Sequence, residues 1–301
     1  MNFLYCFDNN FNLQALNSIN SIINKSKSKN LNFYIIHDSP SNFLDLIEKY
    51  LSEYKNIITI FKFDFDSIDF PKITDAHVSK ATYFRLFFQK YLPEDIEFIT
   101  YVDSDIICMR DPERDVIEAI KNIKDNNLLL GAVNDGMGTY DNQIRLDMKS
   151  DKYFNAGVMV INLKEWRANI QISKILLLME ELREKILWWD QDILNVLIDG
   201  DYLELTNDFN KKTSDFDIMP EKSVIFVHYS GKGKPWSPMF YKEGVNMVYQ
   251  NEFLKTGFSK FHIAPKGFKE NVLFFRNLIS GKYVKFNISD LIKSYIKNKI
   301  K

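Results

Sequence analysis

Two aspartates stand at the end of an apolar stretch and could bind a metal ion together. Phe98 to Val102 is rich in β-branched and aromatic residues, and Asp103 and Asp105 follow it directly. In an extended backbone, residues i and i+2 point to the same side, so the carboxylates are expected to converge if the strand geometry persists past Val102. Hard oxygen ligands of this kind suit a divalent cation that keeps open positions for water or phosphate.

The Asp-x-Asp spacing alone does not identify a site, because the sequence repeats it at 64–66, 190–192, 199–201 and 215–217. The pair at Asp103 directly follows an apolar strand. Ligands of open α/β sheets collect outside the carboxyl ends of strands, which favours this pair over the others.

Two further segments carry side chains that could take part in binding or catalysis. Arg85 lies among aromatic residues in a helix predicted over 79–91, and a guanidinium there requires an acidic or phosphate partner. Asp190 opens the sequence Asp190-Gln191-Asp192. As an alternative without function, Asp190 caps a helix whose first turn holds Asp192, because acids are favourable at a helix start.

His228 follows a strand predicted over 224–227 and precedes the turn Gly231-Lys232-Gly233-Lys234. A single histidine after a strand is usually a hydrogen-bonded structural residue. Exposed backbone N–H groups and lysine ammoniums together bind pyrophosphate, however, so this turn favours a ligand-binding role.

The elements that position these residues alternate between strand and helix. In the first third of the chain, strands are predicted over 3–7, 33–36 and 57–63, with helices over 13–23 and 43–51. This alternation predicts a parallel, right-handed half-sheet of the nucleotide-binding type. The first strand is not followed by Gly-x-Gly-x-x-Gly, and the chain has no Gly-rich loop ending in Gly-Lys-Ser or Gly-Lys-Thr, which disfavours dinucleotide dehydrogenases and P-loop enzymes.

The middle of the chain adds a loop and a strand of interest. Residues 134–140, with two glycines and a tyrosine, suit a lid or an acceptor site, although a plain connecting loop fits equally well. In the apolar segment 153–163, Gly157 permits close approach of backbone or ligand.

Composition sets the limits of function and location. With 39 basic and 40 acidic residues among 301, no global positive field favours nucleic acid as a partner. Cys6 and Cys108 lie in or beside apolar runs and are expected to be buried free thiols in a reducing compartment. Because neither a signal peptide nor an apolar stretch of bilayer length is present, we expect a cytoplasmic protein.

Residues 252–301 hold 11 Lys or Arg and 3 acidic residues, a net charge of +8. Apolar residues recur there at helical spacing between lysines: Ile288, Leu291, Ile292, Tyr295, Ile296 and Ile300. This pattern predicts a basic amphipathic helix that contacts an anionic membrane surface. A helix that packs its apolar stripe on the domain is the alternative.

Four motifs in order resemble glycosyltransferase family 8, and in particular its bacterial lipopolysaccharide α-galactosyl- and glucosyltransferases. They are Asp103-Ser104-Asp105, the segment from Asn155-Ala156-Gly157 to Trp166, the segment 190–195, and the segment 228–236. The resemblance runs from Tyr5 to Trp236 and implies an α/β GT-A fold. That fold has a Rossmann-like N-terminal nucleotide-binding half and a mixed central sheet. We therefore predict a catalytic domain over 1–250 and a basic helical C-terminal segment over 251–301.

The resemblance also implies an Mn²⁺-dependent, retaining transfer of galactose or glucose from a UDP-sugar to a saccharide or glycolipid acceptor, with Mg²⁺ as the alternative ion. The matching positions are, for the metal, Asp103, Asp105 and His228; for the nucleotide, Asp8, Asn10, Phe11, Gly231 and Lys234; for the donor sugar, Arg85, Asn155, Asp190 and Gln191; and for the acceptor, His77. The family commonly has tyrosine where this chain has Phe11, which keeps ring stacking but loses a hydroxyl.

Gln191 matches the position beneath the sugar, and an amide is a poor nucleophile. We therefore expect a same-face displacement in which the departing phosphate accepts the acceptor proton and Asp190 positions the sugar hydroxyls. Covalent catalysis by Asp190 is the rival mechanism. Two other functions are considered, a UDP-sugar-binding protein without transferase activity and a phosphatase of the haloacid-dehalogenase type.

Overall fold

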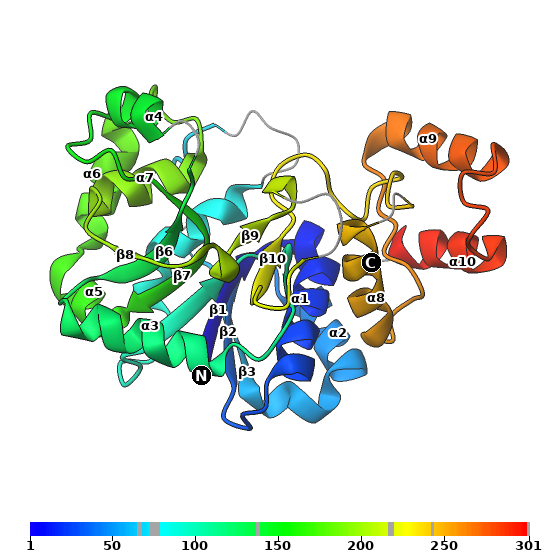
Figure 1. Cartoon of the computed structure of the whole chain (residues 1–301), viewed down its shortest axis with the longest axis horizontal. Coiled ribbons are helices and arrows are strands. Elements are labelled where there is room, and N and C mark those ends of the chain that lie inside the picture. Colours follow the sequence, from blue (N-terminus) through cyan, green and yellow to red (C-terminus); the bar gives the residue numbers. More distant parts are fainter. Residues whose placement is uncertain (65–67, 73–78, 137–138, 216–219, 242–243, 300–301) are drawn as a thin grey trace.

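The computed structural model describes residues 1–64, 68–72, 79–136, 139–215, 220–241 and 244–299. Its main sheet contains, in chain order, β1 (Asn2–Phe7), β2 (Asn32–His37), β3 (Ile58–Lys62), β4 (Phe98–Val102), β6 (Leu130–Asn134), β7 (Phe154–Asn162) and β8 (Leu203–Glu204). The strand order across the sheet is β3-β2-β1-β4-β7-β6-β8 (Figure 1). Strands β1 to β4 run parallel to one another, whereas β7 is antiparallel to both β4 and β6, so the sheet is mixed as expected.

The N-terminal half confirms the predicted alternation of strands and helices. Helix α1 (Asn12–Lys25) connects β1 to β2, and α2 (Ser41–Tyr50) followed by a 3₁₀ helix at Ser52–Ile57 connects β2 to β3. All three strands are parallel. Their carboxyl ends therefore lie at the same edge of the sheet as that of β4, where the candidate ligands follow the strands.

Helices bury both faces of the sheet. In β1, Phe3, Tyr5 and Phe7 pack on one face in a core shared with α1, while Leu4 and Cys6 pack on the other face with the 3₁₀ helix η3 (Lys80–Lys90). Because successive strand residues point to opposite faces, a strand covered on both sides reads as one continuous apolar run. Cys6 and Cys108 are both free and buried, as predicted.

The remaining helices around the sheet are α3 (Glu113–Asp125), α4 (Thr139–Leu146), α5 (Leu163–Asn169), α6 (Ile172–Glu181) and α7 (Trp189–Ile198). A small second sheet joins β5 (Ile106–Cys108), β10 (Phe226–His228) and β9 (Lys211–Lys212), with β10 in the middle. Its strands come from distant parts of the chain and bring the segment after β4 beside the segment that ends in His228.

The C-terminal segment is helical, as predicted, and consists of α8 (Val245–Lys255), α9 (Gly267–Ile279) and α10 (Ile288–Lys299). Helix α8 packs on α1, where Asn17 donates a hydrogen bond to the carbonyl of Tyr249. Helices α9 and α10 lie beyond α8, away from the main sheet (Figure 1). They enclose a small core of their own, with Phe274, Tyr283 and Leu291 fully or almost fully buried. Among the described residues, no helix is long and apolar enough to cross a membrane.

Candidate active site

Asp103 and Asp105 converge by a turn and not by a continued strand. Strand β4 ends at Val102, the Asp103 N–H still bonds to the carbonyl of Gly157 at 2.9 Å, and the turn closes where the Ile106 N–H donates to the Asp103 carbonyl at 3.2 Å. The pairing with β7 thus continues through the Asp103 N–H, but the strand does not reach Asp105, because a turn intervenes before β5 starts at Ile106 in the second sheet. The turn nevertheless brings both carboxylates to the same histidine.

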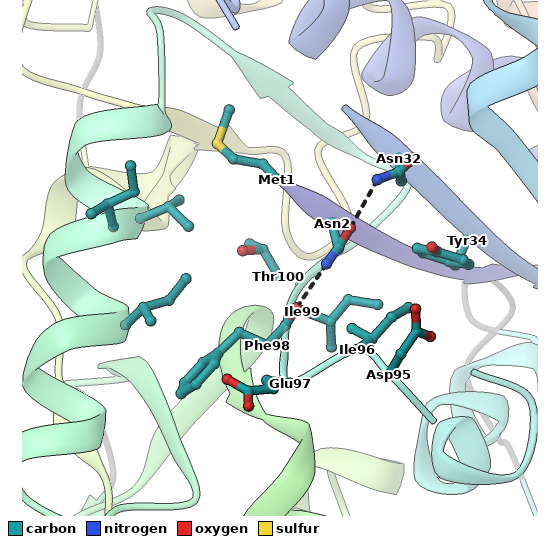
Figure 2. Close-up of a pocket in the computed structure, with 13 residues that line it drawn as sticks. Met1, Asn2, Asn32, Tyr34, Asp95, Ile96, Glu97, Phe98, Ile99 and Thr100 are labelled. Atoms are coloured by element: carbon teal, nitrogen blue, oxygen red, sulfur yellow. Dashed lines mark hydrogen bonds between the residues drawn. The ribbon is translucent and has the colours of Figure 1, made fainter. Parts of the chain in front are cut away.

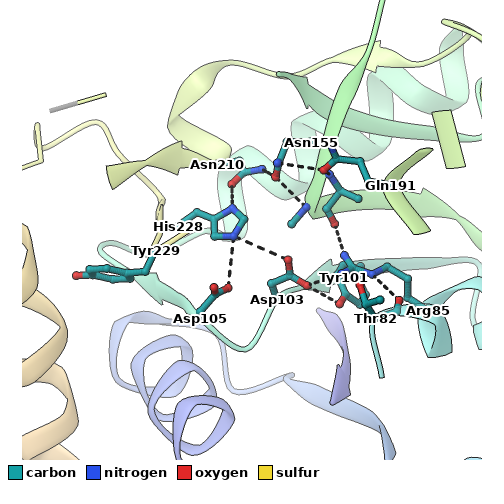
Figure 3. Close-up of polar contacts among 12 residues, drawn as sticks. Thr82, Arg85, Tyr101, Asp103, Asp105, Asn155, Gln191, Asn210, His228 and Tyr229 are labelled. Carbon is teal, nitrogen blue, oxygen red and sulfur yellow. Dashed lines mark hydrogen bonds and ion pairs between the residues drawn. The ribbon is translucent and has the colours of Figure 1, made fainter. Parts of the chain in front are cut away.

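His228 is the last residue of β10, one position later than the predicted strand end, and pairs with Ile106 across the second sheet. Its Nε2 lies 3.4 Å from Asp105 Oδ1 and 3.9 Å from Asp103 Oδ2 (Figure 3). One ligand atom from each of the three residues lies within 4.8 Å of the others. The structure thus brings together the three predicted metal ligands, from segments more than a hundred residues apart.

Each carboxylate has one oxygen that faces His228 and a second oxygen that is paired with a positively charged side chain. Asp103 Oδ1 lies 3.1 Å from the guanidinium of Arg85 and accepts a 2.6 Å hydrogen bond from the Tyr101 hydroxyl. Asp105 Oδ2 lies 2.5 Å from the ammonium of Lys234. The oxygens facing His228 therefore remain directed at a common point, and two oxygens with an imidazole nitrogen are a ligand set that fits Mn²⁺.

Electrostatics keep Asp105 charged. Burial by itself raises the pKa of the Asp105 carboxyl, but Lys234 and then His228 outweigh burial, so that the net pKa lies below its ordinary value. Only the carboxylate form offers lone pairs on both oxygens for a cation.

The glycine of the Asn155-Ala156-Gly157 motif makes room for His228. A Cβ atom at position 157 would lie 2.5 Å from Cε1 and 2.7 Å from Nδ1 of the imidazole ring. Any side chain there would push the ring away from its place between the carboxylates and β7. The sequence predicted that backbone or ligand approaches closely at Gly157; the group that does so in the structure is a side chain, the His228 ring.

Arg85 joins the metal side of the site to the sugar side. Its Nε lies 2.7 Å from Asp190 Oδ2, one terminal nitrogen reaches Asp103, and the other donates to the Ala156 carbonyl at 2.8 Å. The guanidinium also stacks 4.5 Å from the ring centre of Tyr101. Burial lowers the pKa of Arg85, but the charges of Asp103 and Asp190 outweigh it, and the net pKa lies above the ordinary value. The acidic partner expected for this arginine is confirmed.

Asp190 is buried and does not cap its helix. Helix α7 starts at Trp189, with Trp188 as the capping residue, and Asp190 Oδ1 accepts a hydrogen bond from the Thr82 hydroxyl. The uncapped backbone N–H groups of Leu187 and Trp188 bond instead to Asp192, at 2.7 and 2.8 Å. The two acids of this motif therefore have different roles. Asp192 stabilises the start of the helix, whereas Asp190 faces the site.

The backbone is strained just before Asp190. Trp189 has φ +49°, in the left-handed region that bulky side chains rarely adopt. Strain of this kind costs on the order of 1–3 kcal/mol and is found mainly at functional sites. The two residues that follow Trp189 both contact neighbouring elements of the site, Asp190 through Thr82 of η3 and Gln191 through β7.

The side-chain amide of Gln191 makes four hydrogen bonds. Its Oε1 accepts from the Ala156 N–H at 3.0 Å and from Asn155 Nδ2 at 3.1 Å. Its Nε2 donates to Asp135 at 3.2 Å and to the Tyr153 hydroxyl at 3.3 Å. Asn155 and Gln191, which the sequence placed around the donor sugar, are thus direct neighbours in one network.

The predicted nucleotide residues lie at the same edge of the sheet. Asp8 follows β1, which neighbours β4, and its side chain accepts hydrogen bonds from the backbone and side-chain nitrogens of Asn10. Phe11 is half-buried, with the Lys266 ammonium 5.7 Å from its ring centre. Gly231 adopts φ +73°, which favours glycine in the turn before Lys234. His77 lies outside the described residues.

Several residues that contact the site were not predicted from sequence. Thr82 is one of them: it lies three positions before the predicted Arg85 in η3, on the same face, and both side chains contact Asp190. The spacing of three residues from Arg85 is the signal that could have found it. Asn210, which bonds to His228, precedes β9 in a segment without any local pattern that indicates a site.

A cavity at the opposite edge of the sheet is not the candidate site. It has a volume of about 510 Å³ and is lined by the starts of β1, β2 and β4 together with α3 (Figure 2). Asn2 crosses it, donating to the carbonyl of Phe98 and accepting from Asn32. Ligands of α/β sheets bind at the other, carboxyl edge, where the carboxylates and His228 meet.

Gly157→Ala tests the packing of His228. We expect about 10–100-fold weaker Mn²⁺ binding, as is typical when support for a metal ligand is lost. The measurement is a titration of Mn²⁺ followed by electron paramagnetic resonance, without nucleotide. Gly131→Ala is the matched control, since a Cβ there meets side chains of Leu205 and Ile123 at 3.2 and 3.3 Å, away from the site. Unchanged Mn²⁺ affinity in Gly157→Ala would contradict the packing argument.

A pH-dependent stability follows from Asp190. Burial raises its pKa to about 6 from 3.8, against the opposing charge of Arg85. Because the folded state then binds more protons than the unfolded chain, the free energy of unfolding falls as pH rises through this window, by about 3 kcal/mol. Urea unfolding of wild type and Asp190→Asn at pH 4 to 7 measures the difference. Parallel pH curves of the two proteins would show that the carboxyl has no raised pKa.

Sequence relatives agree with the geometry. The family model of glycosyl transferase family 8 matches residues 2–239. The chain is similar to the lipopolysaccharide 1,2-glucosyltransferase of Escherichia coli K12, with 28% identity over 251 residues that cover 78% of this chain and 72% of the relative. It is also similar to the lipopolysaccharide 1,3-galactosyltransferase of Salmonella typhimurium LT2, with 27% identity over 249 residues, covering 78% and 72%.

Solved structures show the same fold. The galactosyltransferase LgtC in complex with donor and acceptor sugar analogs superposes with a TM-score of 0.74 at 20% identity, covering 88% of this chain and 98% of that one. The bifunctional glycosyltransferase WbbM gives a TM-score of 0.63 at 24% identity, covering 84% and 49%. The expected α/β GT-A fold is confirmed. On its sequence match and its fold, the chain belongs to glycosyl transferase family 8.

Proposed function

We propose that this chain transfers a hexose, galactose or glucose, from a UDP-sugar to a saccharide acceptor with retention of the anomeric configuration. The observation that carries the proposal is the convergence of Asp103, Asp105 and His228 beside Lys234, next to the Arg85–Asp190 pair. The names of the related proteins support lipopolysaccharide, or another surface glycan, as the acceptor. Family membership disfavours the phosphatase alternative.

Asp103, Asp105 and His228 would hold the divalent cation, Mn²⁺ in preference to Mg²⁺ because of the imidazole nitrogen. Such an ion, when bound, stabilises the negative charge of the departing diphosphate as a Lewis acid. Lys234, 2.5 Å from Asp105, stands beside this point with its own positive charge and adds to that stabilisation. Asp8, Asn10 and Phe11 would hold the uridine, and the turn from Gly231 to Lys234 would cover the diphosphate.

The bond between the anomeric carbon and the β-phosphate oxygen breaks, and its electrons leave with UDP. The acceptor oxygen bonds to the same face of the anomeric carbon, and its proton passes to the departing phosphate oxygen. Gln191 supports this same-face route, because its amide is fully engaged in hydrogen bonds and is a poor nucleophile. Asp190, held by Arg85 and Thr82, would position sugar hydroxyls together with Asn155. A trapped glycosyl adduct on Asp190, found by mass spectrometry, would favour the covalent rival.

Asp103→Ala tests the proposed donor and metal. In wild type, UDP-galactose or UDP-glucose with Mn²⁺ should raise the melting temperature, and UDP should be released slowly without acceptor. The variant should lose the Mn²⁺-dependent shift and release UDP about 100-fold more slowly, since transition-state stabilisation is removed. Asp201→Ala, at the exposed last residue of the Asp199-Gly200-Asp201 repeat of the same pattern, is the matched control.

The outcomes separate the alternatives. Stabilisation by UDP-sugars without any release of UDP would identify a binding protein that has lost transferase activity. If no UDP compound stabilises the wild type, the proposed donor is wrong.

The C-terminal helices offer a surface for the membrane at which lipid-linked acceptors are found. The predicted stripe on α10 is divided, because Leu291 is buried and Tyr295 half-buried in the small core, while Ile288, Ile292 and Ile296 are exposed. Ile300 lies outside the described residues. The exposed apolar side chains continue over the preceding loop and α9, where they are Phe268, Val272, Phe275, Ile279 and Val284. With a net charge of +8 over residues 252–301, this surface fits the anionic inner face of the cell membrane.

Vesicle binding tests this surface. The triple change Phe268→Ser, Ile279→Ser and Val284→Ser removes the most exposed apolar groups, which are 83%, 87% and 81% accessible, without touching the small core. We expect wild type to sediment with anionic phosphatidylglycerol vesicles and the variant to stay mostly in solution. Leu44→Ser, at an exposed leucine on α2, is the control. Equal sedimentation of wild type and the triple variant would rule out membrane contact through this surface.

A further inference from the structure

Asn210 lies behind the imidazole ring of His228, on the side away from the carboxylates (Figure 3). We propose that Asn210 is a positioning residue that keeps the proton of His228 on Nδ1 and leaves Nε2 free to bind the cation between Asp103 and Asp105. The proposal rests on the metal site proposed above and assigns a function to a residue outside the recognised motifs. It follows from the direction of a chain of amide hydrogen bonds.

Two backbone N–H groups fix this direction. The Ala156 N–H donates at 3.0 Å to Gln191, and the Gly157 N–H donates at 3.0 Å to Asn155. A backbone N–H can only donate, so the side-chain atom that faces each of them must be the amide oxygen. The orientations of the Gln191 and Asn155 amides are therefore set by the backbone of β7 itself.

The remaining orientations follow in turn. Asn155, with its oxygen at Gly157, points its NH₂ group at Gln191 Oε1, 3.1 Å away. Asn210 must then donate its own NH₂ group to the Asn155 oxygen, at 2.7 Å. This leaves the Asn210 oxygen facing His228 Nδ1 at 2.8 Å. An amide oxygen can only accept, so Nδ1 carries a proton, and in the neutral ring the lone pair for a metal ion is therefore on Nε2.

Burial makes the arrangement strict. Asn210 is 2% and His228 5% exposed, so bulk water does not readily replace either partner. A metal-binding histidine commonly donates its second ring N–H to a fixed acceptor, which orients the ring and sets its tautomer. Gly157 contributes to the orientation of His228 in two ways. It leaves room for the ring, and its N–H sets the direction of the hydrogen bonds that end at His228.

Two substitutions separate the function of Asn210 from its volume. Asn210→Leu removes the acceptor for His228 and keeps the side-chain size, and we expect about 10–100-fold weaker Mn²⁺ binding. Asn210→Asp loses the donor to Asn155 but keeps an acceptor for Nδ1–H, and its Mn²⁺ affinity should stay within about threefold of wild type or rise. Mn²⁺ paramagnetic resonance without nucleotide gives the affinities, and melting temperatures report folding. Asn122→Ala, at an exposed position of α3, is the control.

A spectroscopic measurement on wild type does not depend on any variant folding. The sequence has four histidines, so long-range ¹H–¹⁵N spectra of their rings can be assigned. With diamagnetic Zn²⁺ in place of Mn²⁺, His228 should be protonated on Nδ1 and bound to the metal through Nε2. His228→Gln identifies its signals by their loss.

Three results would overturn the proposal: equal Mn²⁺ affinity in wild type and folded Asn210→Leu, an equal loss in Asn210→Asp and Asn210→Leu, or a ring protonated on Nε2. A wild type that binds no divalent cation would overturn the metal site and this proposal together. Because no sugar nucleotide is present in these experiments, a failure of hexose transfer alone would leave the proposal standing.

Discussion

The guanidinium of Arg85 between two buried carboxylates is the interaction on which the site depends. Asp103 follows the end of β4 and Asp190 lies at the start of α7. Their carboxylates lie 3.1 Å and 2.7 Å from the Arg85 guanidinium. Removing one partner of such a buried pair typically costs about 3–5 kcal/mol, because an uncompensated charge remains. Arg85 is itself fixed by the Ala156 carbonyl and the Tyr101 ring. The arginine therefore sets the separation between the proposed metal ligands and the proposed sugar-binding residues.

Strand β7 provides a second constraint from its backbone alone. Gly157 admits the His228 ring, its carbonyl continues the pairing with β4 at Asp103, and its N–H and that of Ala156 orient the amides. The metal side and the sugar side are thus parts of one hydrogen-bonded unit. The backbone of β7 thus holds the polar side chains that come from three separate segments, which are β7 itself, the start of α7, and the segment from Asn210 to His228.

The sequence predicted the parallel N-terminal half well, because buried strands and amphipathic helices have different apolar periods. It predicted which residues meet in the proposed metal site, but not how. The turn at Asp103 and the 3₁₀ helix η3 lie where β5 pairs with β10 and where Arg85 meets Asp190, and local spacing does not encode such long-range contacts. Asp190 and Asp192 have different partners, and they follow a left-handed backbone at Trp189 that its residue type does not indicate. Asn210 could not be predicted, since its partners lie 18 and 55 positions away.

In the proposed site, Asp103, Asp105 and His228 bind one divalent cation against the diphosphate of a UDP-sugar. A crystal structure grown with Mn²⁺ and UDP, measured at an X-ray wavelength at which manganese scatters anomalously, is the decisive experiment. We expect one anomalous peak bonded to Asp103 Oδ2, Asp105 Oδ1 and His228 Nε2, with diphosphate oxygens completing the coordination. A well-ordered UDP with no anomalous peak among these three residues, or a peak held by other ligands, would contradict it.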